Sequence, residues 1–507
     1  MAAGTALSRA TGFLRTMALA ASLGVSSTSD AYNTANTAPN MIFVLVAGGA
    51  LSAAVVPLLV RSEDRAEVAS ALLGATVAVG IVASAVLAVM APLIMQVLTA
   101  GAGGRMGYET FGSLGTSWLR MFAPQVALYA VSVMAVAIMT ARRHLALGAV
   151  APVATNVLTI AAALGFIAVS KGRVDEPGDV TEAARSLLGW GTTLAVGAMA
   201  GIQLLGAWRS EPGLRITFAP SHPAVRELVR VGGWVSVYVV INQLGLAAVT
   251  AIANSVRGGI TAYQWGFMVM QLPYAIVAVS VLSAAVPAIA TAATASERNH
   301  RIARPLRLTV RWLFPAAIGI YAVAAPAARL LVGDAPNELV RAAIVGFGVS
   351  LLPFSVFQVL VRTSYALGER RLPATVNVVV NVVNVLGAAG TMRVADTSAE
   401  RVLGLTVSHA ASYMVGCLVL GTVFHRRRIV SLRDAGSEFP RVVLAAVPMA
   451  AILGALSAWI DAQAGTRVDA LFSVLLAGAV SGGVYMLALQ LCGVGGQLPF
   501  LRERWRG

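Results

Sequence analysis

Two arginines near the start of the chain are the residues whose type and spacing most clearly suggest chemistry. Arg9 and Arg15 lie in the stretch SRATGFLRT, inside an apolar segment that holds no acidic residue. Ser8, Gly12 and Arg15 are four and three residues apart, so they share one helix face. A guanidinium donates a fork of hydrogen bonds that can hold two phosphate oxygens. The pattern predicts an anion site, although arginines reaching from a helix to a membrane surface give the same pattern.

Polar residues in the stretch TSDAYNTANTAPN extend this candidate site. The Asp30 carboxylate could pair with an arginine, bind a cation, or cap a helix after Ser29. Asn33, Asn36 and Asn40 recur at intervals of three and four residues and predict a polar stripe on one helix face. Such a stripe on a membrane helix faces a cavity or another helix.

Three more polar residues interrupt apolar segments later in the chain. Gln243 follows Asn242, Gln271 stands just before Pro273, and Arg362 lies in QVLVRTSYALGERR. Polar and charged side chains inside membrane segments are costly and are candidates for function. Contact between helices explains the two glutamines equally well, and a position near the membrane surface explains Arg362.

The composition shows which elements must position these residues. The 507 residues are 58% hydrophobic and 12% charged, with a mean hydropathy of +0.79, whereas a soluble domain carries roughly a quarter charged residues. Apolar runs of about 20 residues, long enough to span a bilayer, recur along the chain. We therefore predict an all-α polytopic membrane protein with about 14 transmembrane helices, near 6–25, 36–60, 68–99, 115–141, 147–170, 186–208, 227–253, 262–295, 309–333, 340–366, 374–392, 402–424, 441–460 and 468–492.

The basic residues predict the orientation. With the N-terminus inside, the inside loops hold more than twice as many basic residues as the outside loops, and both termini are cytoplasmic. This topology accounts for the net charge of +15 without a nucleic-acid partner. Cys417 and Cys492 lie in apolar segments without metal-ligand spacing, so we expect them to be packing residues.

A repeat predicts how the helices are organised. LSAAVVP ends at Pro57 in the second segment, and LSAAVP ends at Pro287 in the eighth. Pro124 precedes a pair of arginines by 18 residues in the fourth segment, and Pro353 does so by 17 in the tenth. Copies six segments apart point the same way, which is a parallel repeat. We predict two pseudo-symmetric six-helix lobes, 1–225 and 226–430, followed by two extra helices and a short cytoplasmic tail in 431–507.

The missing signatures exclude several functions. The chain has no P-loop, no GxSxG, no HExxH and no DxD in a loop, so it is not predicted to be an enzyme or to bind ATP. Two similar lobes that rock against each other are typical of a transporter. No cofactor is expected, and the membrane potential or an ion gradient must supply any driving force.

The stretches SRATGFLRT, DAYNTANTAPNMIFVLVAGGALSAAVVPLL and VLVRTSYALGERRLPATVN resemble signatures of the MurJ/MviN family of lipid II flippases, in the multidrug/oligosaccharidyl-lipid/polysaccharide exporter superfamily. The resemblance covers nearly the whole chain and implies a transporter of the bacterial plasma membrane. It assigns substrate contacts to positions that match the family's motifs: Ser8, Arg9, Arg15, Asp30, Asn40 and Arg362. It also implies that the two extra helices form a groove for the polyprenyl tail.

This sequence departs from the family pattern at four positions. Thr16 stands where an acid usually follows the second arginine, and Phe43 where some members have an arginine. Met268 and Gln271 replace an arginine and an acid of the eighth helix. The expected cavity is therefore less positively charged than in well-known members.

The expected function is transfer of lipid II, a polyprenyl-diphosphate-linked saccharide, to the outer leaflet by alternating access. Gln243 and Gln271 would contact the headgroup from the second lobe. Partners are the lipid-linked substrate and membrane lipids, with cell-wall synthesis and division proteins as further candidates. Alternatives are a flippase for another polyprenyl-linked glycan, a drug/cation antiporter, a cell-wall scaffold that does not transport, and a membrane glycosyltransferase.

Overall fold

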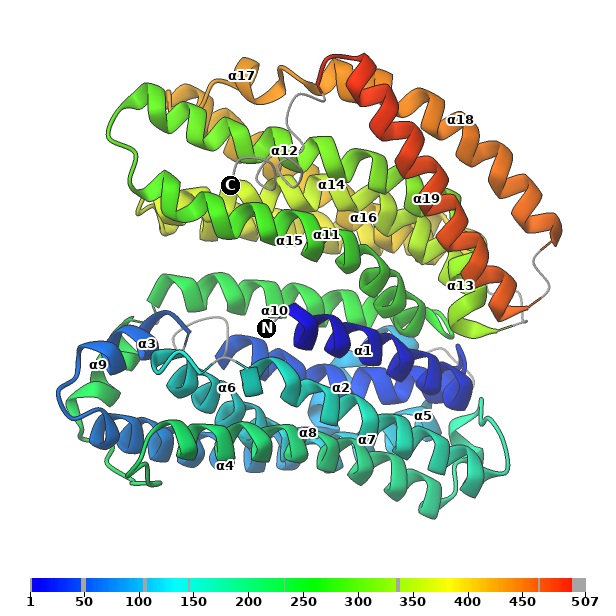
Figure 1. Cartoon of the computed structure of the whole chain (residues 1–507). Helices are drawn as coiled ribbons and strands as arrows, with labels where there is room; N and C mark the ends of the chain where they lie inside the picture. The colour runs from blue at the N-terminus through cyan, green and yellow to red at the C-terminus, as the bar shows by residue number, and fades with distance from the viewer. Residues whose placement is uncertain are drawn as a thin grey trace. The chain divides into compact units, whose positions relative to one another are not determined.

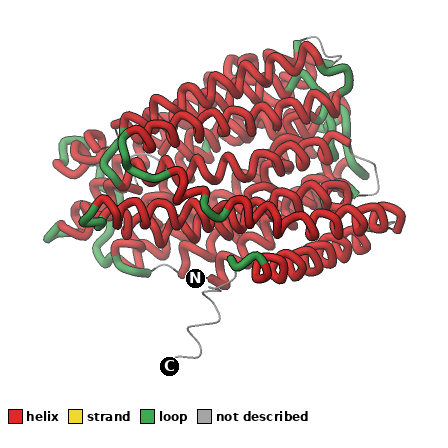
Figure 2. The backbone as a smooth tube through the Cα atoms, turned by 90° about the horizontal axis from the view of Figure 1, so that it is seen from above, coloured by secondary structure: helices red, strands yellow, loops and turns green. Residues whose placement is uncertain are grey.

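The structure is a computed structural model that describes residues 2–46, 52–103, 107–144, 146–231, 233–333, 338–463 and 466–494. Every regular element in these ranges is a helix (Figure 2), which confirms the prediction of an all-α protein. The predicted C-terminal tail after residue 494 and the first residues of the LSAAVVP copy lie outside the described ranges.

The helices form two compact units, residues 1–261 and 262–507. Figure 1 labels the helices of both units. The first unit holds α1 (Ala2–Leu23), α2 (Ser27–Val46), α3 (Ser52–Arg61), α4 (Arg65–Leu98), η2 (Ala100–Ala102), α5 (Tyr108–Phe122), α6 (Gln125–Ala141), α7 (Ala146–Ser170), η3 (Pro177–Asp179), α8 (Glu182–Ser210), α9 (Pro223–Val231) and α10 (Gly233–Ala253). The second holds nearly all of α11 (Gly259–Ala290), then α12 (Ala295–Ala322), α13 (Ala324–Val332), α14 (Glu338–Ala366), α15 (Arg371–Val394), α16 (Ser398–Arg426), α17 (Leu432–Gly436), α18 (Phe439–Gln463) and α19 (Arg467–Leu491).

The lengths of the helices agree with a membrane protein. Among the described residues, ten helices are long and apolar enough to span a membrane, counting α5 and α6 together. The pair α12 and α13, bent by 64°, makes an eleventh if it is one span, and α10 has a shorter apolar stretch, Val237–Ala253. The polar helices α1 and α2 are not among them. Each predicted segment coincides with a helix or a helix pair, but the count of 14 spans stays a prediction.

The second segment begins earlier than its apolar residues indicate. We predicted a start near residue 36, whereas α2 begins at Ser27. The Ser26 hydroxyl accepts a hydrogen bond from the Ser29 backbone N–H at 3.2 Å, as a helix N-cap does. Asp30 therefore lies in the first turn of α2 and not in a loop before it.

One packing pattern occurs in both units. In the first unit α6 and α7 pack on α8, and in the second unit α14 and α15 pack on α16. These helices are the fourth, fifth and sixth segments of each predicted lobe, so the recurrence supports the predicted repeat.

The compact units differ from the predicted lobes at their boundary. The helix α10 contacts α2, α4 and η2, and the first unit accordingly extends to residue 261 rather than 225. The extra helices α18 and α19 pack on each other and on α12, within the second unit. The lobe boundaries at 225 and 430, which rest on the sequence repeat, stay predictions.

Candidate functional site

The polar face of α1 packs against α7 inside the first unit. The Asn156 side chain of α7 donates one hydrogen bond to the Ser8 carbonyl at 3.0 Å and another to the Thr11 hydroxyl at 2.9 Å. A Cβ atom on Gly12 would lie 3.6 Å from the Asn156 amide nitrogen, so the glycine lets the two helices approach closely. Asn156 thereby fixes the rotation of α1 and the direction in which its next turn points.

That next turn carries Arg15, which is half-buried. Its Nε atom is enclosed and has no hydrogen-bond partner in the described part of the chain, and no carboxylate there pairs with it. The guanidinium lies close enough to the hydroxyl groups of Tyr32 and Tyr129 to interact with both electrostatically. Neutral hydroxyls do not offset a full positive charge, so this region can accept an anion. Arg9, two turns earlier, is exposed.

The two tyrosines come from α2 and α6. The Tyr32 hydroxyl hydrogen-bonds to the Thr192 hydroxyl at 3.0 Å, and its ring meets Trp118 and Phe122 edge to face. The Tyr129 ring lies 4.6 Å from the ring of Phe43. Tyr32 is thus held in place by buried neighbours, which fixes its position relative to Arg15.

The asparagine stripe of α2 has three different environments. The Asn33 amide donates to the Thr261 hydroxyl at 3.0 Å, and the Asn40 amide donates to the Asn36 carbonyl at 2.8 Å. The Asn36 side-chain oxygen is enclosed and accepts no hydrogen bond from the described residues. Among the three, Asn36 therefore keeps acceptor capacity that a ligand group could use.

Asp30 is fully buried and bonded to the start of α11. Its carboxylate accepts from the Gly258 backbone N–H at 2.6 Å, from the Thr261 N–H at 3.3 Å and from the Thr261 hydroxyl at 2.9 Å. A carboxylate at a helix N-terminus is favoured by the free N–H groups and by the helix dipole. Asp30 therefore caps α11, whereas Ser26 caps Asp30's own helix. The contact ties α2 to the helix that carries the chain into the second unit.

The other predicted site residues lie apart from the Arg15 region or in the second unit. Gln243 is half-buried on α10, and the Gln271 side chain, on α11, is also half-buried. Arg362 is exposed near the end of α14 and interacts with the Tyr274 hydroxyl of α11. Within the first unit the structure thus places Ser8 and Arg15 on α1 beside α7, with Arg15 near Tyr32 of α2, and the roles predicted for all eight residues remain predictions.

Three residues of this region were not predicted as site residues. Asn156 was noted only as part of the repeat, and Tyr32 and Tyr129 were not singled out. A polar residue in an apolar α7 stretch was the available signal for Asn156. The tyrosines gave no such signal, because an aromatic residue on an apolar helix is usually core.

An ion pair joins the C-terminal ends of two helices in the first unit. Arg142 donates two hydrogen bonds to Glu211, from Nε to Oε2 at 2.7 Å and from Nη2 to Oε1 at 2.6 Å. The hydrogen bonds to Glu211 and its negative charge raise the pKa of Arg142 above its usual value. The pair joins the last residues of α6 and α8, so it is a structural contact and not a ligand site.

Comparison with known proteins agrees with the resemblance seen in the motifs. The family model of the lipid II flippase MurJ matches residues 19–472. A "Probable lipid II flippase MurJ" of Rhizobium meliloti is 25% identical over 474 residues, which cover 89% of this chain and 85% of the relative. A "Lipid II flippase MurJ" of Burkholderia cenocepacia is 26% identical over 399 residues, 75% of each chain.

Solved structures share the fold. A structure of the lipid II flippase MurJ in an inward closed conformation matches with a TM-score of 0.75 and 16% identity, over 100% of this chain and 99% of the other. An inward-facing multidrug resistance MATE family transporter of the MOP superfamily matches with a TM-score of 0.67 and 13% identity, over 83% and 94%. The family match over most of the sequence and the shared helical fold together show that this chain is a multi-pass membrane protein that belongs to the lipid II flippase MurJ family.

Proposed function

We propose that this chain flips lipid II from the cytoplasmic to the outer leaflet of the bacterial plasma membrane by alternating access. The family supplies the class of substrate, and one observation in the structure carries the proposal. Arg15 is a half-buried cation inside a membrane protein, with an enclosed Nε atom and no carboxylate partner among the described residues. An unpaired charge in such a place lowers the stability of the protein. A chain that keeps one is therefore expected to need it for function.

In this proposal Arg15 binds the diphosphate of the substrate. Charge-assisted hydrogen bonds from a guanidinium to phosphate oxygens are roughly twice as strong as bonds between neutral groups. Asn156 holds α1 so that Arg15 lies near Tyr32 and Tyr129, and the Tyr129 hydroxyl can donate to a further oxygen. Arg9, which is exposed, makes the first contact with the anion near the membrane surface.

The neutral residues of the site contact the saccharide or the peptide. Asn36, Asn40, Gln243 and Gln271 offer amide groups that pair with hydroxyls and peptide groups without requiring charge. Arg362, on α14, would contact the substrate from the second unit. The groove for the polyprenyl tail falls to α18 and α19, whose side chains Val447, Leu475 and Leu487 are exposed.

In this proposal Asp30 is a latch, a side chain that holds α11 to α2, and not a substrate ligand. Its bonds to Gly258 and Thr261 hold the start of α11 to α2. Rocking of one lobe against the other needs a fixed point at the connection between them, and these bonds provide one. The membrane potential supplies about 2.3 kcal/mol per charge per 100 mV, and we include it or an ion gradient as the driving force.

The proposed orientation places both termini in the cytoplasm. Arg142, Arg143 and the arginines at the end of α16 then lie inside, as the excess of basic residues in cytoplasmic loops requires. Enzymes that polymerise lipid II at the outer surface must consume the product, so cell-wall synthesis and division proteins are the proposed partners.

Complementation tests this function. A host depleted of its own lipid II flippase would express the chain, and lipid II in the outer leaflet would be measured. We expect rescue by the unaltered chain and by Arg209→Ala, an exposed charge on α8 outside the site. Arg15→Ala should abolish rescue at an equal level in the membrane. Failure of the unaltered chain, with the protein in the membrane, would favour a different polyprenyl-linked glycan or a scaffold.

A further inference from the structure

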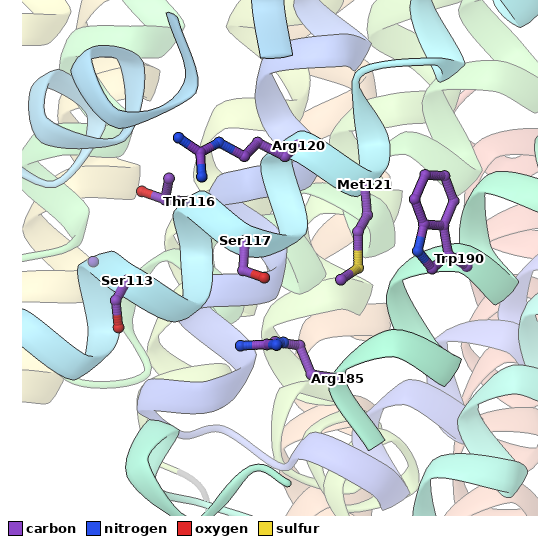
Figure 3. A pocket seen from close by; sticks show the side chains of 8 residues that line it. Ser113, Thr116, Ser117, Arg120, Met121, Arg185 and Trp190 are labelled. Carbon is purple, nitrogen blue, oxygen red and sulfur yellow. The ribbon is translucent and has the colours of Figure 1, made fainter. Parts of the chain in front are cut away.

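A cavity of about 560 Å³ lies between α5 and α8 of the first unit, away from the residues assigned to the substrate. It falls within the volume range of about 300–1,000 Å³ that is typical of ligand pockets. Eight residues line it (Figure 3): Gly112, Ser113, Thr116, Ser117, Arg120, Met121, Arg185 and Trp190. The polar ones among them present hydroxyl groups, guanidinium groups and one indole.

One polar face of α5 makes the first wall. Ser113, Thr116, Ser117 and Arg120 stand at positions i, i+3, i+4 and i+7 of the helix, so their side chains share one face. Arg120 is exposed, and no carboxylate or hydrogen-bond acceptor in the described residues engages its guanidinium. A free arginine above a row of hydroxyls is an arrangement that suits an anion.

Arg185 makes the second wall from the first turn of α8. Its Nη2 atom lies 3.4 Å from the Glu182 carboxylate. The Glu182 side chain is 85% exposed, so this ion pair is weak. The Arg185 Nε atom is enclosed and has no partner in the described part of the chain. In Figure 3 the guanidinium groups of Arg120 and Arg185 lie on either side of the Thr116 and Ser117 hydroxyls. Two positive charges therefore converge on one group of donors.

The two walls are held together below the cavity. The Trp118 indole N–H of α5 donates to the Arg185 carbonyl at 3.1 Å. A Cβ atom on Gly189 would lie 2.3 Å from the Met121 sulfur, so the Met121 side chain would have to move to admit a larger residue. The cavity is thus preformed, which lowers the entropic cost of binding a ligand.

The cavity adjoins an exposed apolar surface of α8. Leu187, Trp190 and Leu194 follow one face of α8 and are 39%, 46% and 68% exposed. Tryptophan gathers at the level of lipid headgroups, and Trp190 lies about two turns from the start of α8. Along α8, Arg185 precedes Trp190 and the apolar Leu194 follows it, an order that matches the two parts of a phospholipid and not those of a soluble anion.

We propose that this cavity binds the headgroup of an anionic phospholipid from the adjacent leaflet. The phosphodiester oxygens would accept hydrogen bonds from Arg120 and Arg185, with Thr116 and Ser117 donating to the remaining oxygens. Trp190 would lie at the level of the glycerol, and the acyl chains would run past Leu194 toward the other end of α8. The proposal does not depend on transport of lipid II, because none of these residues belongs to the Arg15 region.

Protection of a cysteine at the rim tests the proposal. Ser113→Cys would be introduced with Cys417→Ser and Cys492→Ala, and its reaction with a maleimide would be followed in detergent micelles. We expect phosphatidylglycerol to slow labelling by about tenfold relative to phosphatidylcholine, as two charge-assisted contacts imply. Arg120→Gln with Arg185→Gln should remove the difference, while Arg209→Gln, at the other end of α8, should preserve it.

Other results would overturn the proposal. Equal labelling in both lipids for the unaltered pocket would show that no anionic headgroup binds there. Equal protection by inorganic phosphate alone would show a small-anion site, and protection by polyprenyl diphosphate but not by phosphatidylglycerol would show a second site for the substrate lipid. The thermal unfolding midpoint of each variant shows whether the fold is kept, and the amount of phosphatidylglycerol that co-purifies provides an independent reading.

Discussion

In the first unit α6 and α7 pack on α8, and in the second α14 and α15 pack on α16. Both units also close one end with an ion pair, Arg142 with Glu211 and Arg427 with Glu369, in which acid and base have exchanged places. The helix arrangement is therefore repeated, although the side chains that serve it are not the same.

The interiors of the two units differ in polarity. The first unit encloses charged and amide groups: Arg15, Asp30, Asn156 and the bonded pair Ser132 and Gln203. In the second unit, aromatic rings surround His409, with ring centroids of Phe347 at 5.2 Å and Tyr413 at 4.7 Å, and the His409 ring hydrogen-bonds to the Ser350 hydroxyl at 2.6 Å. In the proposed function, binding of the polar headgroup falls mainly to the first unit, and Gln271 and Arg362 add contacts from the second.

The asparagines of the corresponding helices α7 and α15 show the same difference. Asn156 bonds across to α1, whereas Asn381 bonds back to Asn377 of its own helix at 2.9 Å. The predicted counterpart of α1 is α10, and α10 belongs to the first compact unit.

Loss of the Asp30 latch should have the largest effect on stability. Asp30→Ala would leave two buried backbone N–H groups without an acceptor, and we expect a loss of roughly 3–5 kcal/mol. Asp30→Asn keeps one acceptor oxygen and should cost less. The thermal unfolding midpoint of the purified protein measures both, and a midpoint unchanged by Asp30→Ala would contradict the latch.

Matched substitutions in α7 and α15 sharpen the comparison of the units. Asn156→Leu should destabilise the protein by about 1–3 kcal/mol and impair transport, because α1 loses its bonds to α7. Asn381→Leu removes an amide that bonds to Asn377 of the same helix, and we expect it to affect transport less than Asn156→Leu does. Unfolding and complementation of the two variants provide the test, and equal effects on transport would break the assignment of binding to the first unit.

The two terminal ion pairs should differ in strength. The Glu211 side chain is 6% exposed and accepts two bonds, whereas Glu369 and Arg427 are 44% and 51% exposed. Glu211→Gln should therefore lower the unfolding midpoint more than Glu369→Gln, and added salt should weaken only the second pair. A larger loss with Glu369→Gln would run against this ranking.

The pH dependence of the first pair follows from the raised pKa of Arg142. A raised pKa contributes stability that is present below the unfolded value and is lost only as the pH rises past the folded value, far above neutrality. Arg142 therefore should add no pH dependence between about pH 6 and pH 9, which unfolding midpoints across that range would check.

Removal of the polar contact in the second unit should have the smallest effect. Ser350→Ala with His409→Phe replaces both partners, so no polar group is left unpaired and the ring stays in its aromatic surroundings. We expect a change within about 1 kcal/mol and normal transport. Loss of transport at an unchanged unfolding midpoint would show that the Ser350–His409 region takes part in transport, which this account does not expect.

The helical architecture could be predicted because each helix leaves a long apolar run in the sequence. The start of α2 at Ser27 could not, because its first turns are polar and carry no hydropathy signal. The grouping of α10 with the first unit depends on contacts with α2 and η2, which no local pattern encodes.

The candidate site was predictable only in part. Arg15 was found because a charge in an apolar segment is conspicuous, and its lack of a carboxylate partner agrees with that prediction. The bonds from Asp30 to Gly258 and Thr261 join residues far apart in the chain, so the sequence left capping, pairing and cation binding equally open. The spacing of Ser113, Thr116, Ser117 and Arg120 was visible, but their cavity required α8 as its second wall.

Binding of purified chain to polyprenyl lipids tests the central claim most directly. Affinities for lipid II, polyprenyl diphosphate and polyprenyl monophosphate would be compared in the unaltered protein, Arg15→Ala and Arg209→Ala. We predict a preference for the diphosphates that Arg15→Ala lowers by about tenfold or more while Arg209→Ala leaves it intact. Equal binding of lipid II by the unaltered protein and by Arg15→Ala would contradict the account.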